Sequence, residues 1–173
     1  MKTRILAIAA AAVLLAQGAQ ASDGTISFTG ALQAATCTIT GGGNQTVTLP
    51  TLATSTLAAA GATGGDTFFN IAVTGCTGGL TTATAYFEAG ANVDSVTGRL
   101  KNTGAAANVQ IQVLNGSGSV VNLAGATTVA QSTTAASLTS NAGTQSFIAR
   151  YYATGATTAG AVTSSVTYSM VYN

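Results

Sequence analysis

The clearest pattern of hydrophobic and polar positions lies in the last stretch of the chain, residues 162–173. Its hydrophobic side chains fall on every second position, with mostly polar residues between them, and they are Val166, Tyr168, Met170 and Tyr172. A period of two is typical of a β-strand with one buried face. No residue of the sequence follows to supply a further strand, so we expect this strand to lack a partner on one side.

A second alternating series lies near the other end of the sequence. Ile26, Phe28 and Leu32 share one face of an extended segment, and Gly30 falls on the same face between them. A glycine inside a strand usually marks a bulge or the close approach of another backbone. The pattern is also typical of an ordinary first strand of a sheet, so the series alone does not decide its role.

Short alternating runs separated by turn residues fill the region between these two series. The predicted strands cover residues 37–39, 47–49, 69–73, 85–89, 109–113, 120–123 and 147–152. The expected loops are residues 51–65, with a weak helical turn at 57–60, and residues 131–143 and 155–160. Pro50 ends one run, and Asn115-Gly116-Ser117-Gly118 signals a turn. Without a convincing helix, this order predicts a single all-β domain built as an antiparallel sandwich.

The first 21 residues have the organisation of a secretory signal peptide. Lys2 and Arg4 precede an apolar run over residues 5–16, and Ala19-Gln20-Ala21 supplies the small residues of a cleavage site. An uncleaved membrane helix is the alternative, but about 12 apolar residues are too few to span a bilayer comfortably. We expect cleavage before Ser22, which removes 21 of 173 residues and leaves 152, a suitable length for one domain.

Charged side chains are scarce, at 5% of the sequence. After cleavage the cations are Arg99, Lys101 and Arg150 and the acids are Asp23, Asp66, Glu88 and Asp94, which gives a net side-chain charge of −1. Nucleic-acid binding normally needs clustered lysine and arginine, so the composition excludes that class. The near neutrality also removes the repulsion that keeps copies of a protein apart, and so permits their close association.

The residues of common catalytic and metal sites are missing from the sequence. It has no histidine, which is the commonest general base and metal ligand. Its mature carboxylates are isolated, without an Asp-x-Asp calcium loop, and no serine lies in a Gly-x-Ser-x-Gly turn. We therefore expect no enzyme activity, cofactor or metal. For Arg99, Lys101 and Arg150 we expect a solvated outer face, with a recognition site as the alternative.

Two cysteines, Cys37 and Cys76, both lie in the part that is expected to be exported. In an oxidising compartment an even pair is most simply a disulfide. A closed loop of about 40 residues contributes roughly 4 kcal/mol in the chain-entropy model, a large share of the usual stability of about 5–15 kcal/mol. A redox pair is the alternative, but the sequence has no Cys-x-x-Cys and no histidine to activate a thiolate.

Several of these features together resemble the type 1 fimbrial subunits of the chaperone–usher pathway, over essentially the whole mature chain. They are Gly30, the Cys37 and Cys76 pair, the run Phe147-Ile148-Ala149-Arg150-Tyr151-Tyr152-Ala153 and the ending Tyr172-Asn173. Gly160 is the fourteenth residue from the end and Tyr172 is the penultimate one. That family carries a glycine and an aromatic residue at these places in its chaperone-recognition strand.

The resemblance implies an incomplete immunoglobulin-like β-sandwich that lacks its last strand and is completed by donor-strand complementation. A periplasmic chaperone first fills the groove beside the C-terminal strand, and the N-terminal arm of the next subunit replaces it by strand addition. The donated face would consist of Ile26, Phe28, Gly30 and Leu32. The acceptor groove and chaperone-recognition residues would be Gly160, Val166, Tyr168, Met170, Tyr172 and Asn173, with the Asn173 carboxylate as the chaperone's anchor.

The same resemblance divides the chain into a signal peptide (residues 1–21), a donor-strand arm (22–36) and a pilin domain (37–173). The 15-residue arm is shorter than in the best-known major subunit of type 1 fimbriae. We expect a structural subunit that is secreted through the periplasm to the cell surface, polymerises head to tail and supports bacterial adhesion. Its partners would be other copies, the chaperone, an outer-membrane usher and tip adhesin or adaptor subunits, and not nucleic acid.

Two alternatives to a shaft subunit are a minor or adaptor subunit and a glycan-binding adhesin module. A tip adhesin usually carries an extra receptor domain, for which 152 residues leave no room. Stacking of sugars also commonly uses tryptophan, and the sequence contains none.

Overall fold

The computed structural model describes residues 26–30 and 36–173. The expected signal peptide, the first arm residues 22–25 and Leu32 lie outside the described residues. The chain divides into two units, residues 1–32 and 33–173. The fold below is that of the second unit.

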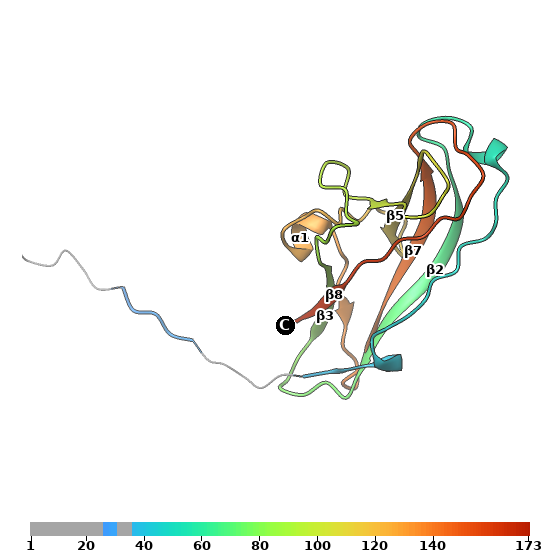
Figure 1. Cartoon of the computed structure of the whole chain (residues 1–173). Coiled ribbons are helices and arrows are strands. Elements are labelled where there is room, and N and C mark those ends of the chain that lie inside the picture. The colour runs from blue at the N-terminus through green and yellow to red at the C-terminus, as the bar shows by residue number, and fades with distance from the viewer. Residues whose placement is uncertain (1–25, 31–35) are drawn as a thin grey trace, which may run out of the picture. The chain divides into compact units, whose positions relative to one another are not determined.

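Five strands form the larger sheet, and each pairs antiparallel with its neighbours. Their order across the sheet is β1 (Thr38–Ile39), β2 (Thr63–Thr74), β7 (Gly143–Ala153), β5 (Val109–Asn115) and β4 (Leu100–Lys101). The long strands β2 and β7 run side by side in its centre (Figure 1). Inward positions along them alternate with outward ones, because successive side chains of a strand point to opposite faces.

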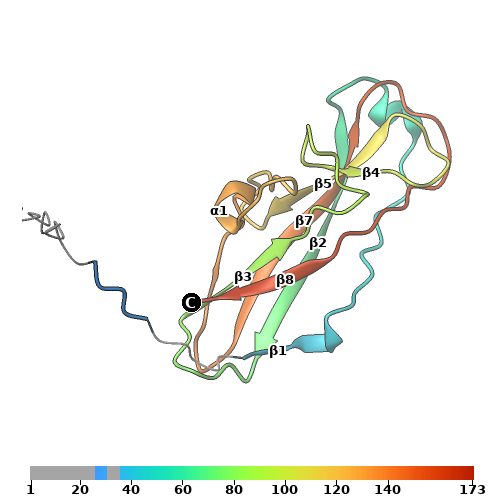
Figure 2. The same ribbon diagram turned by 60° about the vertical axis from the view of Figure 1, so that its left-hand side comes forward.

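Three strands form the smaller sheet, in the order β6 (Ala136–Ser137), β3 (Thr82–Phe87) and β8 (Tyr168–Tyr172). The last strand of the chain, β8, lies at an edge of this sheet and pairs only with β3 among the described strands. Both views show β8 beside β3 (Figures 1 and 2). The predicted all-β sandwich is confirmed, and it is incomplete at β8.

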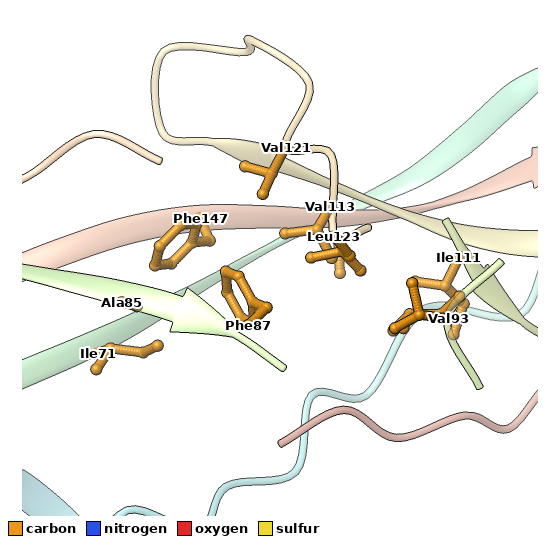
Figure 3. Close-up of a cluster of buried hydrophobic side chains, with 11 residues drawn as sticks. Ile71, Ala85, Phe87, Val93, Ile111, Val113, Val121, Leu123 and Phe147 are labelled. Atoms are coloured by element: carbon orange, nitrogen blue, oxygen red, sulfur yellow. The ribbon is translucent and has the colours of Figure 1, made fainter. Parts of the chain in front are cut away.

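The core lies between the two sheets and is built around Phe147, which is fully buried. The Phe147 ring stacks on Phe69 of β2 at 5.4 Å between centroids and meets the edge of Phe87 of β3 at 5.3 Å. Aliphatic side chains from both sheets and from the loop after β5 surround these rings (Figure 3), and they include Ile71, Val113, Val121 and Leu123. Large apolar residues are few in this sequence, so the three rings supply much of the volume between the sheets.

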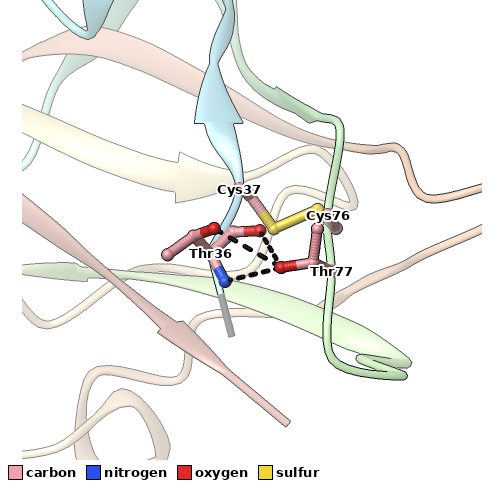
Figure 4. Close-up of a disulfide and its surroundings, with 4 residues drawn as sticks. All are labelled: Thr36, Cys37, Cys76 and Thr77. Carbon is pink, nitrogen blue, oxygen red and sulfur yellow. Dashed lines mark hydrogen bonds between the residues drawn. A yellow bond between two sulfur atoms is a disulfide. The ribbon is translucent and has the colours of Figure 1, made fainter. Parts of the chain in front are cut away.

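The predicted disulfide between Cys37 and Cys76 is present and joins the residue before β1 to the loop that follows β2 (Figure 4). Next to it, the Thr77 backbone N–H donates to the Thr36 carbonyl oxygen at 3.0 Å. β1 pairs with β2 over only two residues. The bridge therefore holds the start of the folded domain to the larger sheet, where the ladder alone is short.

Two expected strands are not observed as strands. Residues 47–49 form no ladder, although Val47 and Leu49 are half-buried and pack against the core. Residues 120–123 contribute only one isolated bridge, from Val120 to Leu114. Alternation places side chains correctly in both segments, but a strand also needs a neighbouring backbone to pair with.

The region expected to be a polar loop, residues 131–143, was predicted wrongly in part, because it contains β6 (Ala136–Ser137). A short helix, α1 (Thr128–Gln131), ends at its first residue and is capped by Thr127, whose hydroxyl oxygen accepts from the Ala130 N–H. Gln131 itself is fully buried. The helical turn expected at 57–60 is displaced, because the structure has a 3₁₀ helix at Thr54–Leu57 and none at 58–60. No helix in the described part of the chain is long and apolar enough to cross a membrane.

Candidate functional site

The C-terminal segment alternates between half-buried and exposed residues without a break from Val162 to Asn173. Its last part is β8, and the residues before Tyr168 continue the same extended pattern outside any ladder. Tyr168 and Met170 pack against the core, while Ser169 and Val171 point away from it. One face of this segment therefore covers the core of the sandwich. One backbone edge of the segment has no partner strand among the described residues.

The free edge of β8 carries unpaired backbone groups at defined positions. Thr82 and Asn173 exchange both of their backbone hydrogen bonds, and the Glu88 N–H donates to the Thr167 carbonyl. In an antiparallel ladder, hydrogen-bonded pairs alternate with pairs that are not hydrogen-bonded. The N–H and C=O groups of Tyr168, Met170 and Tyr172 therefore point away from β3, to the side where the described structure has no strand.

The segment before β8 is held in place by separate side-chain and backbone hydrogen bonds instead of a ladder. The Asn102 Oδ1 accepts from the Thr163 N–H at 2.8 Å, and the Thr103 N–H donates to the Thr163 carbonyl at 2.8 Å. Asn92 donates to Ser165 from the same side. These contacts fix residues 162–167 along one edge only, so their other edge stays available.

Residues 43–50 form the opposite rim. Among the described residues, the backbone groups of 44–50 make no hydrogen bond, and the Gly43 carbonyl accepts one from the Tyr168 hydroxyl at 2.9 Å. Extended backbone without partners is unusual inside a fold, because most buried backbone groups are paired. Both rims thus carry backbone groups without hydrogen-bond partners in the described structure.

Between the two rims lies a groove of about 610 Å³. Its floor is the apolar core, and its lining includes Val47, Leu49, Phe69, Ile71, Phe87, Leu100, Ile111, Val113, Val166 and Tyr168. Ser164 also lines it, and the Ser164 hydroxyl is buried without a hydrogen-bond partner in the described structure. The arrangement offers an apolar floor and two backbone edges, which suits an extended peptide better than a compact small molecule.

Tyr168 connects the two rims of the groove. Its ring packs near Phe87, with centroids 6.5 Å apart, and its hydroxyl reaches Gly43 on the other rim. Burial of the ring raises the pKa of the Tyr168 hydroxyl above its ordinary value, so it stays protonated and able to donate. Replacement of Gly43 by a residue with a side chain would bring its Cβ to 3.7 Å from this hydroxyl.

The predicted acceptor residues are found at different places along this segment. Val166 and Tyr168 line the groove. Tyr172 packs on the cluster beside the disulfide, and Met170 packs on both that cluster and the main core. The backbone oxygen of Asn173 accepts from the N–H groups of Thr81 and Thr82, at 2.7 and 2.8 Å.

Gly160 lies where the chain approaches the loop before β5. A Cβ at this position would come within 2.5 Å of the Ala106 backbone nitrogen. A side chain therefore does not fit here without a shift of the backbone. The glycine allows the close approach that sets the start of the C-terminal segment.

The described residues of the predicted donor face lie in the first unit of the chain. Ile26 and Phe28 are 79% and 90% exposed, and residues 26–30 form no helix or ladder. Gly30 is described with them, whereas Leu32 lies outside the described residues. Two large apolar side chains with this exposure can still be buried by a partner.

None of the charged side chains among the described residues lines the groove, and no group of three or more residues that could hold a metal ion occurs in the same part of the chain. The Asp94 carboxylate accepts from the Val96 N–H and from Gln110, and these bonds lower the pKa of Asp94 to about 2. Arg99 and Arg150 both donate to glutamine oxygens, and Arg99 lies over the Tyr152 ring. The expectation of a fully solvated face is therefore incomplete, because these cations are positioned by neighbours.

Sequence reasoning missed two parts of the groove. The rim at 43–50 was expected to contain an ordinary strand, and Ser164 was not distinguished from the other serines. The local sequence could not reveal this rim, because tertiary contacts with other segments decide which backbone edge stays unpaired. The alternation Val162, Ser164, Val166 would have indicated that Ser164 points inward.

The sequence matches the model of a known protein family. The model described as "FimA: Type-1 fimbrial protein, A" matches residues 49–173. Solved structures of the same architecture include the P pilus rod subunit PapA, with a TM-score of 0.60, 18% identity and coverage of 79% of this chain and 99% of that one. A chain from the structure of a chaperone–usher pilus gives a TM-score of 0.63 at 20% identity, and it covers 88% of this chain and 96% of that one. At these identities the likeness establishes the fold.

Other relatives have a higher sequence identity to this chain than these solved structures. The major fimbrial subunit SMF-1 of Stenotrophomonas maltophilia (strain K279a) is 42% identical over 163 residues, which cover 90% of this chain and 95% of the relative. The F17 fimbrial protein of Escherichia coli is 41% identical over 175 residues, which cover 97% and 94%. Both relatives are fimbrial proteins by name. The chain is thus a member of the type-1 fimbrial protein family.

Proposed function

We propose that the chain is a shaft subunit of a chaperone–usher fimbria, and that it polymerises when the N-terminal arm of one copy fills the groove of another. The observation that carries this proposal is the apolar groove beside the unpaired edge of β8. A separate segment of the same sequence carries the alternating series Ile26, Phe28, Gly30 and Leu32. The same chain therefore carries both an incomplete sandwich and a segment whose alternating side chains suit the groove.

Backbone pairing supplies the first part of the contact. An extended arm in the groove would face the free groups of Tyr168 and of the residues before it on one side, and those of residues 44–50 on the other. Each hydrogen bond formed this way contributes about 0.5–1.5 kcal/mol net. Pairing does not depend on side-chain identity, so the backbone gives affinity and the side chains give register.

Side-chain burial supplies the second part. Complete burial of an isoleucine or phenylalanine that starts exposed contributes roughly 1.5–3 kcal/mol. Ile26 and Phe28 start at 79% and 90% exposure, so their insertion would contribute about 3–6 kcal/mol together. Gly30 leaves one inward position without a side chain, which allows a closer approach of the arm to the groove floor.

The contact joins two different surfaces, the arm of one copy and the groove of the next. Such a heterologous contact does not close on itself and builds an open fibre. We propose the division into signal peptide (1–21), arm (22–36) and pilin domain (37–173) on this basis, with export through the periplasm to a cell-surface fimbrium. Support of bacterial adhesion is the corresponding role of the fibre.

The other proposed partners follow from the same groove. An unpaired edge is a risk for aggregation before assembly, so a periplasmic chaperone would cover β8 until an outer-membrane usher brings the next arm. Gly160 and Asn173 would belong to the surface that the chaperone recognises. Tip adhesin or adaptor subunits would complete the fibre at its end.

Two substitutions in the arm test the proposal. Phe28→Asp places a charge on the face that enters the apolar groove, and we expect it to abolish fibres in electron micrographs of the exported full-length protein. Ser27→Asp is the matched control, because Ser27 alternates with this face, and it should leave fibres intact. Deletion of residues 22–31 should also abolish them. Fibres of ordinary length and number from Phe28→Asp or from the deletion would contradict the proposal.

A minor subunit is the second candidate, because the minor fimbrial subunit HifD of Haemophilus influenzae is 31% identical over 188 residues, which cover 98% of this chain and 83% of that relative. Quantitative mass spectrometry of purified fibres separates the two roles. A shaft subunit should form most of the fibre mass. A few copies per fibre would favour the minor role.

A further inference from the structure

Ser164 carries a hydroxyl group that lacks a hydrogen-bond partner. Among residues 26–30 and 36–173, its Oγ is the one buried side-chain nitrogen or oxygen atom without such a partner. Native structures satisfy the large majority of their buried polar side-chain atoms, so an exception needs a reason. The amides of Gln131 and Gln145 are also buried, and both are bonded. The Ser164 hydroxyl is therefore open to a group from outside the described fold.

Ser164 lies on the inward side of the C-terminal segment, where it lines the groove. Val162 and Val166, two residues away on either side, pack against the core. Tyr168 continues the same inward series and also lines the groove. The Ser164 hydroxyl is thus a polar point within an apolar wall of the groove.

The backbone of Ser164 faces the open edge of the same segment. The backbone groups of its neighbours point to the other edge, where the Thr163 N–H donates to Asn102 and the Thr163 carbonyl accepts from the Thr103 N–H, both at 2.8 Å. Successive residues of an extended chain direct these groups to opposite edges. The Ser164 N–H and C=O have no partner in the described structure. An extended occupant of the groove therefore meets three hydrogen-bonding groups of one residue.

The hydroxyl restricts which residue of an occupant can lie against it. A bulky apolar side chain placed there covers the hydroxyl and leaves it buried without a partner, which is unfavourable. A glycine removes this cover and lets the main chain of the occupant approach closely. The groove therefore favours a glycine at the position that faces Ser164.

Gly30 of the arm is a glycine that its own surroundings do not require. A Cβ added at Gly30 meets no atom within 4 Å, and its φ does not lie in the left-handed region. An alanine would fit both the space and the backbone of the arm. Gly30 nevertheless interrupts the apolar series of Ile26, Phe28 and Leu32. The arm by itself therefore does not explain this glycine.

The arm and the groove match when Gly30 lies against Ser164. Phe28 and Leu32 flank the glycine in the arm, and apolar residues packed on the core flank Ser164 in the groove. A shift of the arm by two residues in either direction places Phe28 or Leu32 over the hydroxyl. A shift by one residue turns the apolar side chains of the arm out of the groove. One register therefore satisfies both the apolar positions and the hydroxyl.

We propose that Ser164 is a specificity-determining residue of the groove, and that its hydroxyl hydrogen-bonds the main chain of another copy's arm at Gly30. The inference rests on the proposed function, because it names one contact of the arm within the same groove. This contact selects glycine at the arm position and fixes the register, since the other registers cover the hydroxyl. It adds a polar determinant to recognition by apolar burial and backbone pairing.

Binding of synthetic arm peptides tests the contact. The receptor is the full-length chain with Phe28→Asp, which disables its own arm, and the probe is a fluorescent peptide of residues 22–36 measured by anisotropy. Ser164→Ala should weaken binding about fivefold, through the loss of one hydrogen bond. A Gly30→Ala peptide should bind about tenfold more weakly than the parent peptide to the parent groove, but less than about threefold more weakly to the Ser164→Ala groove. Ser169→Ala is the matched control and should have no effect, because Ser169 is exposed and outside the groove lining.

Urea unfolding of the same receptors without peptide separates this role from a structural one. Ser164→Ala removes a buried hydroxyl that has no partner, so it should raise the urea midpoint although it weakens peptide binding. A serine that only supported the fold would lower both the midpoint and the binding, and that result would overturn the inference.

The outcomes also distinguish this inference from the proposed function. No binding of the parent peptide to the parent groove would contradict arm insertion and the Ser164 contact together. Ordinary binding that Ser164→Ala leaves unchanged, or equal losses for the Gly30→Ala peptide in both grooves, would overturn the Ser164 contact alone and leave arm insertion standing.

Discussion

The side chain of Gln131 completes the edge of β3 that faces away from β8. It is fully buried, its oxygen accepts from the Phe87 N–H at 3.0 Å and its nitrogen donates to the Phe87 carbonyl at 2.6 Å and to the Gly125 carbonyl at 3.1 Å. A side-chain amide thus takes the place that a neighbouring strand would have. We predict that Gln131→Ala is strongly destabilising.

The magnitude follows from the groups that are left behind. Alanine at 131 leaves the Phe87 N–H and C=O without their partner, next to a Phe87 side chain that is itself buried. Each buried backbone group without a partner costs about 1–3 kcal/mol, so we expect a loss of roughly 2–6 kcal/mol for the two together. Against a usual total of about 5–15 kcal/mol, this is a large fraction.

Urea unfolding of the oxidised full-length chain, followed by circular dichroism, measures the free energy of unfolding. Gln112→Ala is the matched control, because Gln112 is also buried but its partner, the Arg150 guanidinium, can turn to water. We expect the control to lose less than about 1.5 kcal/mol. Equal losses for the two variants, or a loss below about 1 kcal/mol for Gln131→Ala, would refute the reasoning.

Two further predictions concern the charged loop and the disulfide. The pKa of Asp94 is lowered from 3.8 to about 2, so its ionised form stabilises the fold above pH 3.8 and this contribution is lost as the pH falls toward 2. In thermal melts, Asp94→Asn should therefore differ from the parent at pH 5 and approach it at pH 2, and a constant difference would argue against this cause. Replacement of Cys37 and Cys76 together by serine opens a loop with a sequence separation of 39 and should lower the free energy of unfolding by about 4 kcal/mol; a urea midpoint equal to that of the oxidised parent would contradict it.

The regular strands of the core were predictable because their side-chain pattern is local. Phe69, Ile71 and Val73 alternate in β2, and Val109, Ile111 and Val113 alternate in β5. Both strands extend further than the runs that predicted them, because pairing with the long β7 continues past the apolar positions. The disulfide was predictable from cysteine count and compartment alone.

Features that depend on tertiary partners were not predictable in this way. Gln110 and Gln112 alternate with the core residues of β5, a pattern typical of a solvent face, yet Gln112 is buried beneath the outward side chains of its own sheet. Residues 47–49 have the same alternation as a true strand, and only the absence of a paired backbone distinguishes them in the described structure. Gln131 looked like part of a polar loop, because burial of an amide depends on distant groups that can satisfy it.

The two edges of the smaller sheet show that the opening at β8 is specific. On the β3 side, the backbone groups beyond β6 are satisfied by side chains, with the Ala85 N–H bonded to Gln145 at 2.6 Å and the Phe87 N–H bonded to Gln131. On the β8 side, the groups of Tyr168 and Met170 have no such substitute among the described residues. A fold that merely tolerated loose edges would leave both of them open. Because one edge is closed by buried amides, the opening is confined to the β8 edge among the described residues, which agrees with the proposed role of that edge in receiving an extended partner.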